Sequence, residues 1–269
     1  MNTTVGQHVE RAVVYAEREG YRALELDLYG PEPFGDGVRP LVVYIHGGGW
    51  RVSHRSRAPR ETREWTPGFF ERITDAGFVV AAPGYRLSAE AIFPAQLDDV
   101  LTAIRWLQDN AGPLRVDRGR TYLYGFSGGG ALSSLAGLVE GAPPVAGVVS
   151  VYPVTDLLAL DQEKTDSFEA HLVGGPIGAH IELARAASAV YHAHGGAPPF
   201  LLQHGADDTW VPCQQSVSLA AALRAVGAPV ELEVVPGADH FFEGVPDVES
   251  IYTRALTFLV DLDSAAALT

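Results

Sequence analysis

A serine in this chain stands in the local setting that nucleophilic acyl transfer requires. Ser127 has Gly125 and Gly129 two positions away on either side, after an apolar run at residues 121–126 and before a helix-forming stretch. A strained strand-to-helix turn exposes such a hydroxyl, and glycines let the flanking backbones pass closely. The helix that begins behind Ser127 also favours negative charge on an oxyanion. We interpret Ser127 as a nucleophile; the alternative is a glycine-rich turn without chemistry.

A second glycine run could supply donors for that oxyanion. His46-Gly47-Gly48-Gly49-Trp50 follows the apolar run at residues 41–45. Acyl transfer needs N–H groups aimed at the developing oxyanion, and consecutive glycines can present them without side chains in the way. We expect the amides of Gly48, Gly49 and Gly128 to form the oxyanion hole, with Gly47 the weaker candidate. A phosphate loop is excluded because no Lys-Ser/Thr or Gly-x-Gly-x-x-Gly pattern follows.

The serine needs a base and an orienting carboxylate. His240 is the expected base, because it lies in a loop just past the apolar run at residues 230–235. Three aspartates compete for the role of the acid. Asp207 and Asp208 lie in the loop that leaves the run at residues 200–203 at its carboxyl end, where parallel sheets carry their sites. We favour Asp208 and keep Asp207 as the alternative, whereas Asp239 would have to bend back on its own neighbour.

These residues are positioned by strands that alternate with helices. The sequence predicts strands at residues 12–17, 22–29, 41–45, 78–82, 121–126, 146–152, 200–203 and 230–235. It predicts helices at residues 94–110, 128–140, 216–226 and 248–262, the first of them ended by Gly112-Pro113. The prediction is an α/β fold with a mostly parallel sheet of about eight strands, an antiparallel N-terminal hairpin and helices on both faces. We expect one domain over residues 1–269, with residues 155–197 as a small lid or insertion.

Composition excludes several classes of partner. The net charge of −14 argues against nucleic acid and against an anionic membrane. The apolar runs are too short for a membrane span. One cysteine, Cys213, excludes an intramolecular disulfide, and residues 1–20 lack the apolar core of a secretion signal. We therefore expect a cytoplasmic protein with a small-molecule ester substrate and without a metal, since His192-x-His194 has no third ligand spaced with it.

With these motifs, the sequence resembles the hormone-sensitive-lipase-like esterase and lipase branch of the α/β-hydrolases, particularly short bacterial members without a large N-terminal cap. The resemblance covers nearly the whole chain and is carried by residues 27–31, 46–50, 85–87, 93–95, 124–129, 204–212 and 237–241. In that family the acid lies three residues after the glycine of a His-Gly pair and is followed by x-x-Val-Pro. Counting from Gly205 leads to Asp208, with Val211-Pro212 in place. Gly128 departs from the alanine that is frequent at its position, but its amide is unchanged.

The resemblance implies a serine esterase without a metal or organic cofactor, in a family whose members often form homo-oligomers. Because little chain precedes His46, we expect an open pocket and short acyl chains. An aryl formamidase, another amidase or a peptidase could use the same triad, and a non-catalytic binding module could keep the fold. Four aromatic residues are candidates for substrate binding: Trp50, Phe93, Trp210 and Phe241.

Five arginines follow the oxyanion glycines: Arg51, Arg55, Arg57, Arg60 and Arg63. The simpler interpretation is a solvated loop whose arginines pair with Glu61 and Glu64. The other is a local attraction for anionic substrates at the mouth of the pocket.

Overall fold

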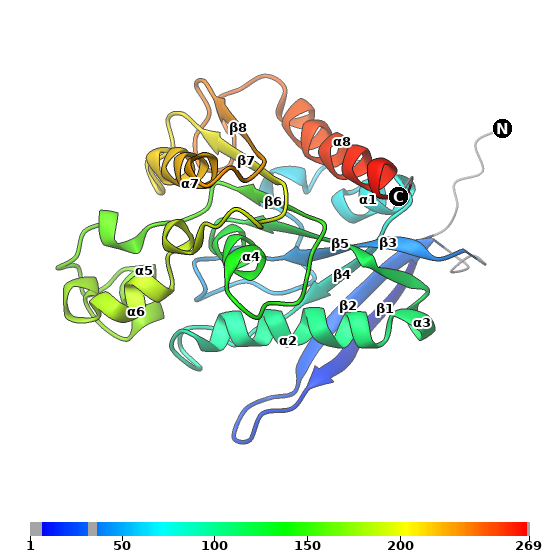
Figure 1. Ribbon diagram of the computed structural model, residues 1–269, viewed down its shortest axis with the longest axis horizontal. Helices are drawn as coiled ribbons and strands as arrows, with labels where there is room; N and C mark the ends of the chain where they lie inside the picture. Colours follow the sequence, from blue (N-terminus) through cyan, green and yellow to red (C-terminus); the bar gives the residue numbers. More distant parts are fainter. Residues whose placement is uncertain (1–6, 32–36, 268–269) are drawn as a thin grey trace.

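The computed structural model describes residues 7–31 and 37–267. Within them, one sheet has the strand order β1-β2-β4-β3-β5-β6-β7-β8 (Figure 1). β2 is antiparallel to both β1 and β4, and the other neighbours are parallel. The strands are Gln7–Ala16 (β1), Leu24–Pro31 (β2), Arg39–Ile45 (β3), Val79–Pro83 (β4), Val116–Phe126 (β5), Gly147–Val151 (β6), Phe200–Gly205 (β7) and Val230–Val235 (β8). The predicted α/β fold with an antiparallel N-terminal hairpin is confirmed.

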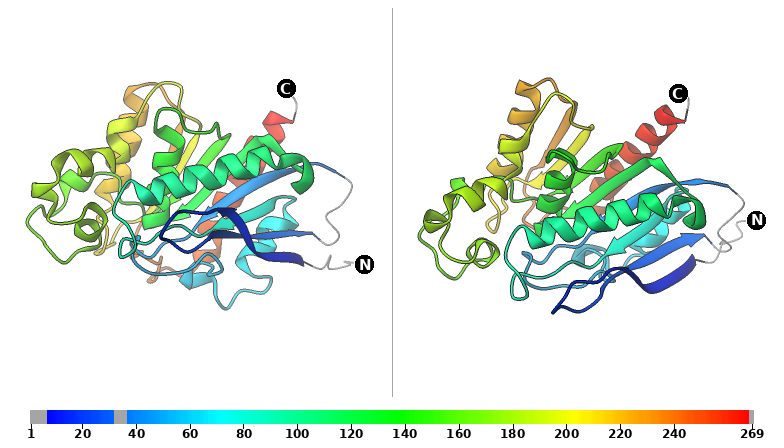
Figure 2. Two further views of the ribbon diagram at one scale, coloured as in Figure 1. Left: turned by 90° about the horizontal axis from the view of Figure 1, so that it is seen from below. Right: turned by 60° about the horizontal axis from the view of Figure 1, so that its bottom comes forward.

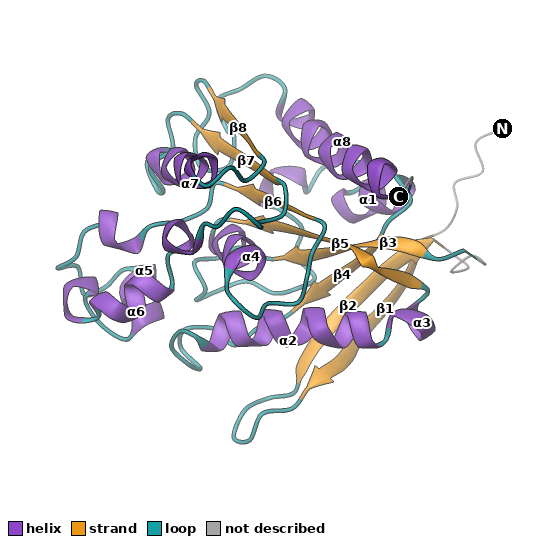
Figure 3. Ribbon diagram, in the orientation of Figure 1, coloured by secondary structure: helices purple, strands orange, loops and turns teal. Residues whose placement is uncertain are grey.

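Helices cover both faces of this sheet (Figures 2 and 3). α2, α4 and α7 contribute to one buried apolar cluster, and α1 and α8 contribute to a second cluster on the opposite face. The helices are Phe69–Asp75 (α1), Ala95–Asp109 (α2), Ala111–Leu114 (α3), Gly128–Leu138 (α4), Phe168–Val173 (α5), Ile181–Ala186 (α6), Gln214–Ala225 (α7) and Val248–Ala266 (α8). Short 3-10 turns occupy Arg60–Thr62, Leu157–Ala159, Ile177–Ala179 and Ala189–His192.

β3 shows why the central strands read as continuous apolar runs. Leu41, Val43 and Ile45 belong to the first cluster. Val42 and Tyr44 belong to the second. Successive side chains of a strand point to opposite faces, so a strand covered on both sides must be apolar at every position.

The first strand begins earlier than the sequence predicted, at Gln7 rather than at residue 12. Its pairing with β2 shifts register between Glu10 and Val13, and Ala12 has a φ of 58°. The Ala12 N–H donates to the side-chain carboxylate of Asp27 in β2, at 3.0 Å, rather than to a backbone carbonyl of that strand. This bulge breaks the apolar alternation, which is why the pattern was recognised only beyond it.

Short helices were the other omission. α1, α5 and α6 were not predicted, because six or seven residues are too few to establish helical periodicity. α5 does carry a start signal, since the Ser167 side chain accepts the N–H of Ala170 at 3.0 Å. The predicted end of the first helix at residue 110 agrees within one residue with the end of α2 at Asp109, although Gly112 and Pro113 lie inside the short helix α3.

Residues 155–197 connect β6 to β7 and contain α5, α6 and three of the 3-10 turns. With α5 and α6, they extend beyond the ends of the strands, at the left of Figure 1. Leu157, Leu172 and Ile177 are buried in the first apolar cluster, so the segment is anchored to the main body. Among residues 7–31 and 37–267, no helix combines the length and the hydropathy that crossing a bilayer requires.

Candidate active site

The turn between β5 and α4 holds Ser127 in a strained conformation, with φ 53° and ψ −121°. Close packing leaves no room for side chains at the flanking glycines. A Cβ on Gly125 would lie 2.2 Å from the Gly129 carbonyl oxygen, and one on Gly129 would lie 2.1 Å from that of Ile45. The Ser127 N–H donates to Val151 of β6 at 2.9 Å. The turn is therefore fixed from both sides, and strain of this kind is typical of functional positions.

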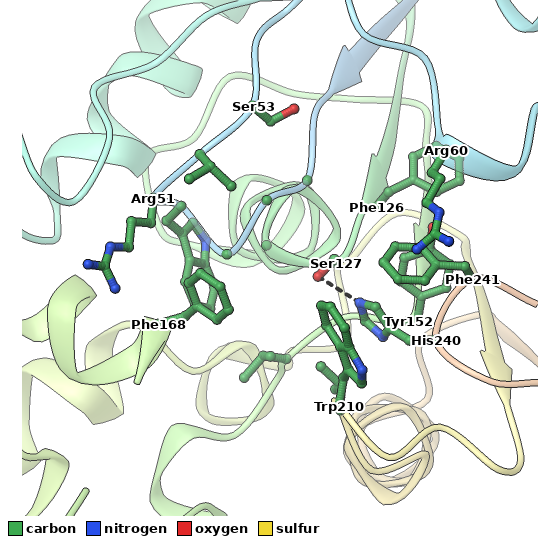
Figure 4. Close-up of a pocket in the computed structure, with 18 of the residues that line it drawn as sticks. Arg51, Ser53, Arg60, Phe126, Ser127, Tyr152, Phe168, Trp210, His240 and Phe241 are labelled. Carbon is green, nitrogen blue, oxygen red and sulfur yellow. Dashed lines mark hydrogen bonds between the residues drawn. The ribbon is translucent and has the colours of Figure 1, made fainter. Parts of the chain in front are cut away.

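Three side chains from the carboxyl ends of different strands meet at this turn. Ser127 Oγ lies 3.1 Å from Nε2 of His240, which follows β8 (Figure 4). Nδ1 of the same ring lies 2.6 Å from Oδ2 of Asp208, which follows β7. His240 and Asp208 are both buried. The structure thus brings together the serine, base and acid that the sequence proposed.

The two other aspartates do not reach the imidazole. The Asp239 carboxylate accepts the N–H groups of Phe241 and Glu243 at 2.9 and 2.8 Å, which closes the local turn. Asp207 is exposed. Of the three candidates, Asp208 alone is hydrogen-bonded to His240.

Asp208 is held as a carboxylate by four donors. Its Oδ1 accepts the N–H groups of Trp210 and Val211, each at 2.8 Å. Its Oδ2 lies 2.6 Å from His240 and 3.2 Å from Nε2 of His204. Burial disfavours the charge, but hydrogen bonds from His204 and His240 outweigh it and hold the pKa of Asp208 well below its usual range.

His204 is a contact that sequence reasoning missed. It is fully buried at the end of β7, and the sequence indicated no role for it beyond the His-Gly pair of the resemblance. Its Nε2 also lies 2.8 Å from the Val211 carbonyl, and its Nδ1 lies 2.7 Å from the Ser216 hydroxyl. Because both neighbours of Nε2 are acceptors, that nitrogen carries the proton and donates to Asp208. The His-Gly pair before the acid loop was the available signal.

The glycine run after β3 approaches the same turn. Gly48 and Gly49 have φ of +102° and +58°, a region that favours glycine. A Cβ on Gly128 would lie 3.0 Å from the Trp50 nitrogen and 3.3 Å from that of Gly49, so the two loops are in contact. In residues 7–31 and 37–267, no acceptor takes the N–H of Gly48 or Gly49. These amides are available to an oxygen bound beside Ser127.

His46, immediately before these glycines, is buried and structural. Its ring stacks on Tyr85 with centroids 4.4 Å apart, and the Tyr85 hydroxyl donates to the His46 carbonyl at 2.9 Å. Burial lowers the pKa of His46 to about 4. The imidazole is therefore neutral at pH 7 and packs as an aromatic ring behind the glycine loop.

A cavity of about 750 Å³ opens above Ser127. Trp50, Trp210 and Phe241 line it, as do Tyr152 and Phe168, which the sequence did not identify (Figure 4). Trp210 is 67% exposed and stacks on His240 with centroids 5.6 Å apart, whereas Trp50 is 2% exposed and presents little surface.

The assignment of Phe93 to the cavity was wrong. Phe93 is 4% exposed and belongs to the first apolar cluster. Its N–H donates to Leu172 at 2.8 Å, which ties the segment before α2 to α5. Its apolar ring packs in the core and does not line the cavity.

Glu61 is a half-buried acid next to the site, and the sequence did not identify it. Its Oε1 accepts the hydroxyls of Tyr252 and Tyr152, the latter at 2.9 Å. Its Oε2 has no hydrogen-bond partner among the residues described. The Tyr152 ring packs against His240 with centroids 4.5 Å apart. Burial raises the pKa of Glu61, although both hydroxyls oppose this shift. Nothing in the sequence distinguished this glutamate from a surface residue.

The arginines after the glycine run pair with acids other than those predicted. Arg55 contacts Asp27 at 2.9 Å, and Arg60 contacts Glu243 at 3.0 Å. The expected partner Glu61 faces the tyrosines instead. Within the described part of the chain, no group of three or more His, Cys, Asp or Glu residues could hold a metal ion.

Comparisons with known proteins agree with this architecture. The profile of the BD-FAE family matches residues 26–223. Esterase LipC of Mycobacterium tuberculosis is 30% identical over 81% of this chain, and ethyl acetate hydrolase of Pseudomonas putida is 31% identical over 91%. The alignments cover 57% of LipC and 79% of the hydrolase. The chain thus spans little more than half the length of the first of these relatives.

A solved structure has the same fold over nearly its whole length. It is described as a truncated form of a carbohydrate esterase from gut microbiota, with 23% identity and a TM-score of 0.82, and the match covers 98% of this chain and 99% of that one. The family profile, the relatives and the sheet order lead to one conclusion. The chain belongs to the BD-FAE family, within the hormone-sensitive-lipase-like branch of the α/β-hydrolases.

Proposed function

We propose that this protein is a serine esterase that cleaves small carboxylic esters through an acyl-enzyme on Ser127. The observation that carries the proposal is the unbroken series of contacts from Asp208 through His240 to Ser127, at 2.6 and 3.1 Å. A nucleophile, a base and an orienting carboxylate in this geometry are the parts that acyl transfer requires. The names of the relatives LipC and ethyl acetate hydrolase support the same activity.

Acylation follows from this geometry. His240 Nε2 takes the proton of Ser127 as Oγ bonds to the ester carbonyl carbon and the carbonyl electron pair moves to oxygen. The N–H groups of Gly48, Gly49 and Gly128 stabilise that oxyanion, and Asp208 stabilises the imidazolium. When the oxyanion collapses, the bond to the alcohol oxygen breaks, and the alcohol leaves with the proton from His240.

Deacylation repeats these steps with water. His240 removes a proton from a water molecule, whose oxygen attacks the acyl carbon of the Ser127 ester. The same amides stabilise the second oxyanion, and its collapse returns the proton from His240 to Ser127 Oγ. The released product is the carboxylic acid, and no cofactor enters either half of the reaction.

We propose that residues 155–197 form an anchored cover that restricts the acyl group to short chains. Phe168 of α5 lies against the glycine loop, because a Cβ on Gly49 would be 2.5 Å from its ring. Phe168 is 40% exposed and lines the cavity, so it narrows the space beside the proposed oxyanion hole. The name of the ethyl acetate hydrolase relative, a protein acting on an acetyl ester, is consistent with this preference.

Matched substrates test the proposal. We expect 4-nitrophenyl butyrate to be cleaved with a kcat/KM at least a hundredfold above that of 4-nitrobutyranilide, and butyrate to exceed the laurate ester. N-formyl arylamines and acetylated sugars complete the panel. Amide or formamide turnover equal to ester turnover would favour an amidase or formamidase. Absence of turnover on every substrate by folded protein would favour a binding module.

A further inference from the structure

The cavity above Ser127 has a basic wall in an acidic protein. Its described lining includes two acidic residues, Asp166 and Glu169, against five basic ones: Arg51, Arg57, Arg60, Arg63 and Lys164. The chain as a whole has a net charge of −14. Concentrating positive charge at this place raises the local concentration of anionic ligands.

Two of these five basic residues are paired within the protein. Arg51 lies 3.6 Å from Asp166, at the edge of the cavity beyond Phe168 (Figure 4). Arg60 pairs with Glu243 at 3.0 Å and lies over the Phe241 ring, 5.0 Å from its centroid. A ligand would therefore have to compete with Asp166 for Arg51 and with Glu243 for Arg60.

Arg57 and Arg63 are different. Both side chains are exposed, and among the residues that the structure describes neither has a hydrogen bond or an ion pair through its guanidinium. Together with Ala58, they line both the cavity above Ser127 and an adjoining hollow of about 440 Å³. The two arginines therefore lie where the cavity above Ser127 and the second hollow share a wall.

The backbone holds these arginines in place. The Arg57 carbonyl accepts the hydroxyl of Tyr44 at 2.8 Å, and its N–H donates to His54 at 3.0 Å. Arg63 closes the 3-10 turn Arg60–Thr62. The acid between them, Glu61, points inward to Tyr152 and does not neutralise them. The backbone positions of both arginines are therefore fixed, and neither charge is neutralised by Glu61.

We infer that Arg57 and Arg63 bind a carboxylate carried by the substrate at a distance from the ester that Ser127 cleaves. The inference rests on the proposed esterase function and narrows its substrate class to esters with an anionic end. A guanidinium matches a carboxylate with two parallel hydrogen bonds, and the apolar rings of Phe241 and Trp210 accommodate the part between the charge and the ester.

Charged and neutral esters of equal size test this site on both sides of the scissile bond. The first pair is 4-nitrophenyl hemiadipate and 4-nitrophenyl hexanoate, and the second is 4-carboxyphenyl acetate and 4-carbamoylphenyl acetate. The readout is the charged-to-neutral ratio of kcat/KM, so intrinsic reactivity cancels when proteins are compared. In one pair at least, we expect Arg57→Gln/Arg63→Gln to lower the ratio about tenfold.

Two controls make the result specific. Arg57→Lys/Arg63→Lys keeps the charge and should lose less than the glutamine variant, whereas Arg224→Gln, on the exposed face of α7, should leave the ratio unchanged. Raising the salt concentration should lower the wild-type ratio and leave that of the glutamine variant flat. Equal ratios for the wild type and the glutamine variant in both pairs would overturn the site, as would an equal loss in Arg224→Gln.

A binding measurement separates failure of this site from failure of the esterase proposal. Calorimetry on Ser127→Ala protein needs no turnover, and it uses monoethyl adipate for the acyl side and 4-carboxyphenyl acetate for the alcohol side. For at least one of the two ligands, we expect binding about tenfold weaker when Arg57→Gln and Arg63→Gln are added. Unchanged binding of both ligands would contradict the carboxylate site, whatever the enzyme cleaves. Turnover of neutral esters by the wild type reports on the esterase proposal alone.

Discussion

Ser127 Oγ lies 3.1 Å from Nε2 of His240, although 113 residues separate the two in the chain. They meet because β5 and β8 belong to one parallel run of the sheet and release their chains at the same edge. The loops that carry these two residues are far apart along the chain. The sheet order is therefore what makes the proposed nucleophile and base neighbours.

The acid is tested by comparing two adjacent aspartates. Replacing Asp208 with Asn should lower kcat by roughly 10⁴-fold, because the amide no longer stabilises the imidazolium or fixes the ring tautomer. Asp207→Asn should change kcat less than threefold, since Asp207 is exposed and does not contact His240. Steady-state kinetics on one aryl ester decides between them. A larger loss for Asp207→Asn would reverse the assignment.

Gly48 can be tested against a glycine with similar backbone geometry. Gly48 has φ +102°, and a Cβ there would lie 2.2 Å from the Val52 carbonyl; Gly77 has φ +100° and open space around it. We expect Gly48→Ala to lower kcat at least a hundredfold, because the displaced loop misdirects the oxyanion donors. Gly77→Ala should cost stability only.

Kinetics and thermal unfolding of the two alanine variants separate these effects. Similar kcat values for both would show that the loop after β3 does not support the oxyanion.

The sequence predicted those features whose residues lie close together along the chain. The turn at Ser127 was predictable because its glycines, its strand and its helix lie within a few residues. Asp208 could be separated from Asp207 only through the resemblance, since each follows the same strand. The structure adds the reason, which is the pair of backbone N–H groups and the imidazole of His204 around one carboxylate.

Features that depend on packing between distant segments were not predictable. Phe93 and Phe168 are both phenylalanines near helix starts, yet Phe93 is in the core and Phe168 lines the cavity. Glu61 lies among arginines in the sequence, but its partners are tyrosines 91 and 191 residues away. Composition and periodicity do not encode such pairings.

His46 should make the protein sensitive to acid. Its pKa is about 4 in the folded protein against 6.5 for an ordinary histidine, so the unfolded state binds the extra proton between those values. Stability therefore falls as the pH drops from 6.5 to 4, by up to about 3 kcal/mol from this group.

Urea unfolding at pH 7 and pH 4.5 measures the loss. We expect His46→Gln, whatever its stability at pH 7, to lose less than the wild type between the two pH values. His194→Gln, at an exposed position, should lose as much as the wild type. An unchanged pH dependence in His46→Gln would contradict burial of a neutral imidazole.

Phe168 and Phe93 provide a matched test of the cavity. Phe168→Ala should raise kcat/KM for 4-nitrophenyl octanoate relative to the butyrate ester by about fivefold, because about 1 kcal/mol of steric exclusion is removed. Phe93→Ala should lower the free energy of unfolding by about 3–5 kcal/mol through loss of core packing, with little change in this ratio. A shift in chain-length preference in Phe93→Ala alone would contradict the proposed cover.

The central claim is that Ser127 carries the acyl group, and intact-mass analysis after reaction with a fluorophosphonate tests it most directly. We predict one stoichiometric adduct on the peptide containing Ser127 in the wild type, together with loss of ester hydrolysis. Ser127→Ala should show no adduct and a kcat reduced by roughly 10⁶-fold. An adduct on another residue that abolishes activity, or wild-type ester hydrolysis by Ser127→Ala, would contradict the account.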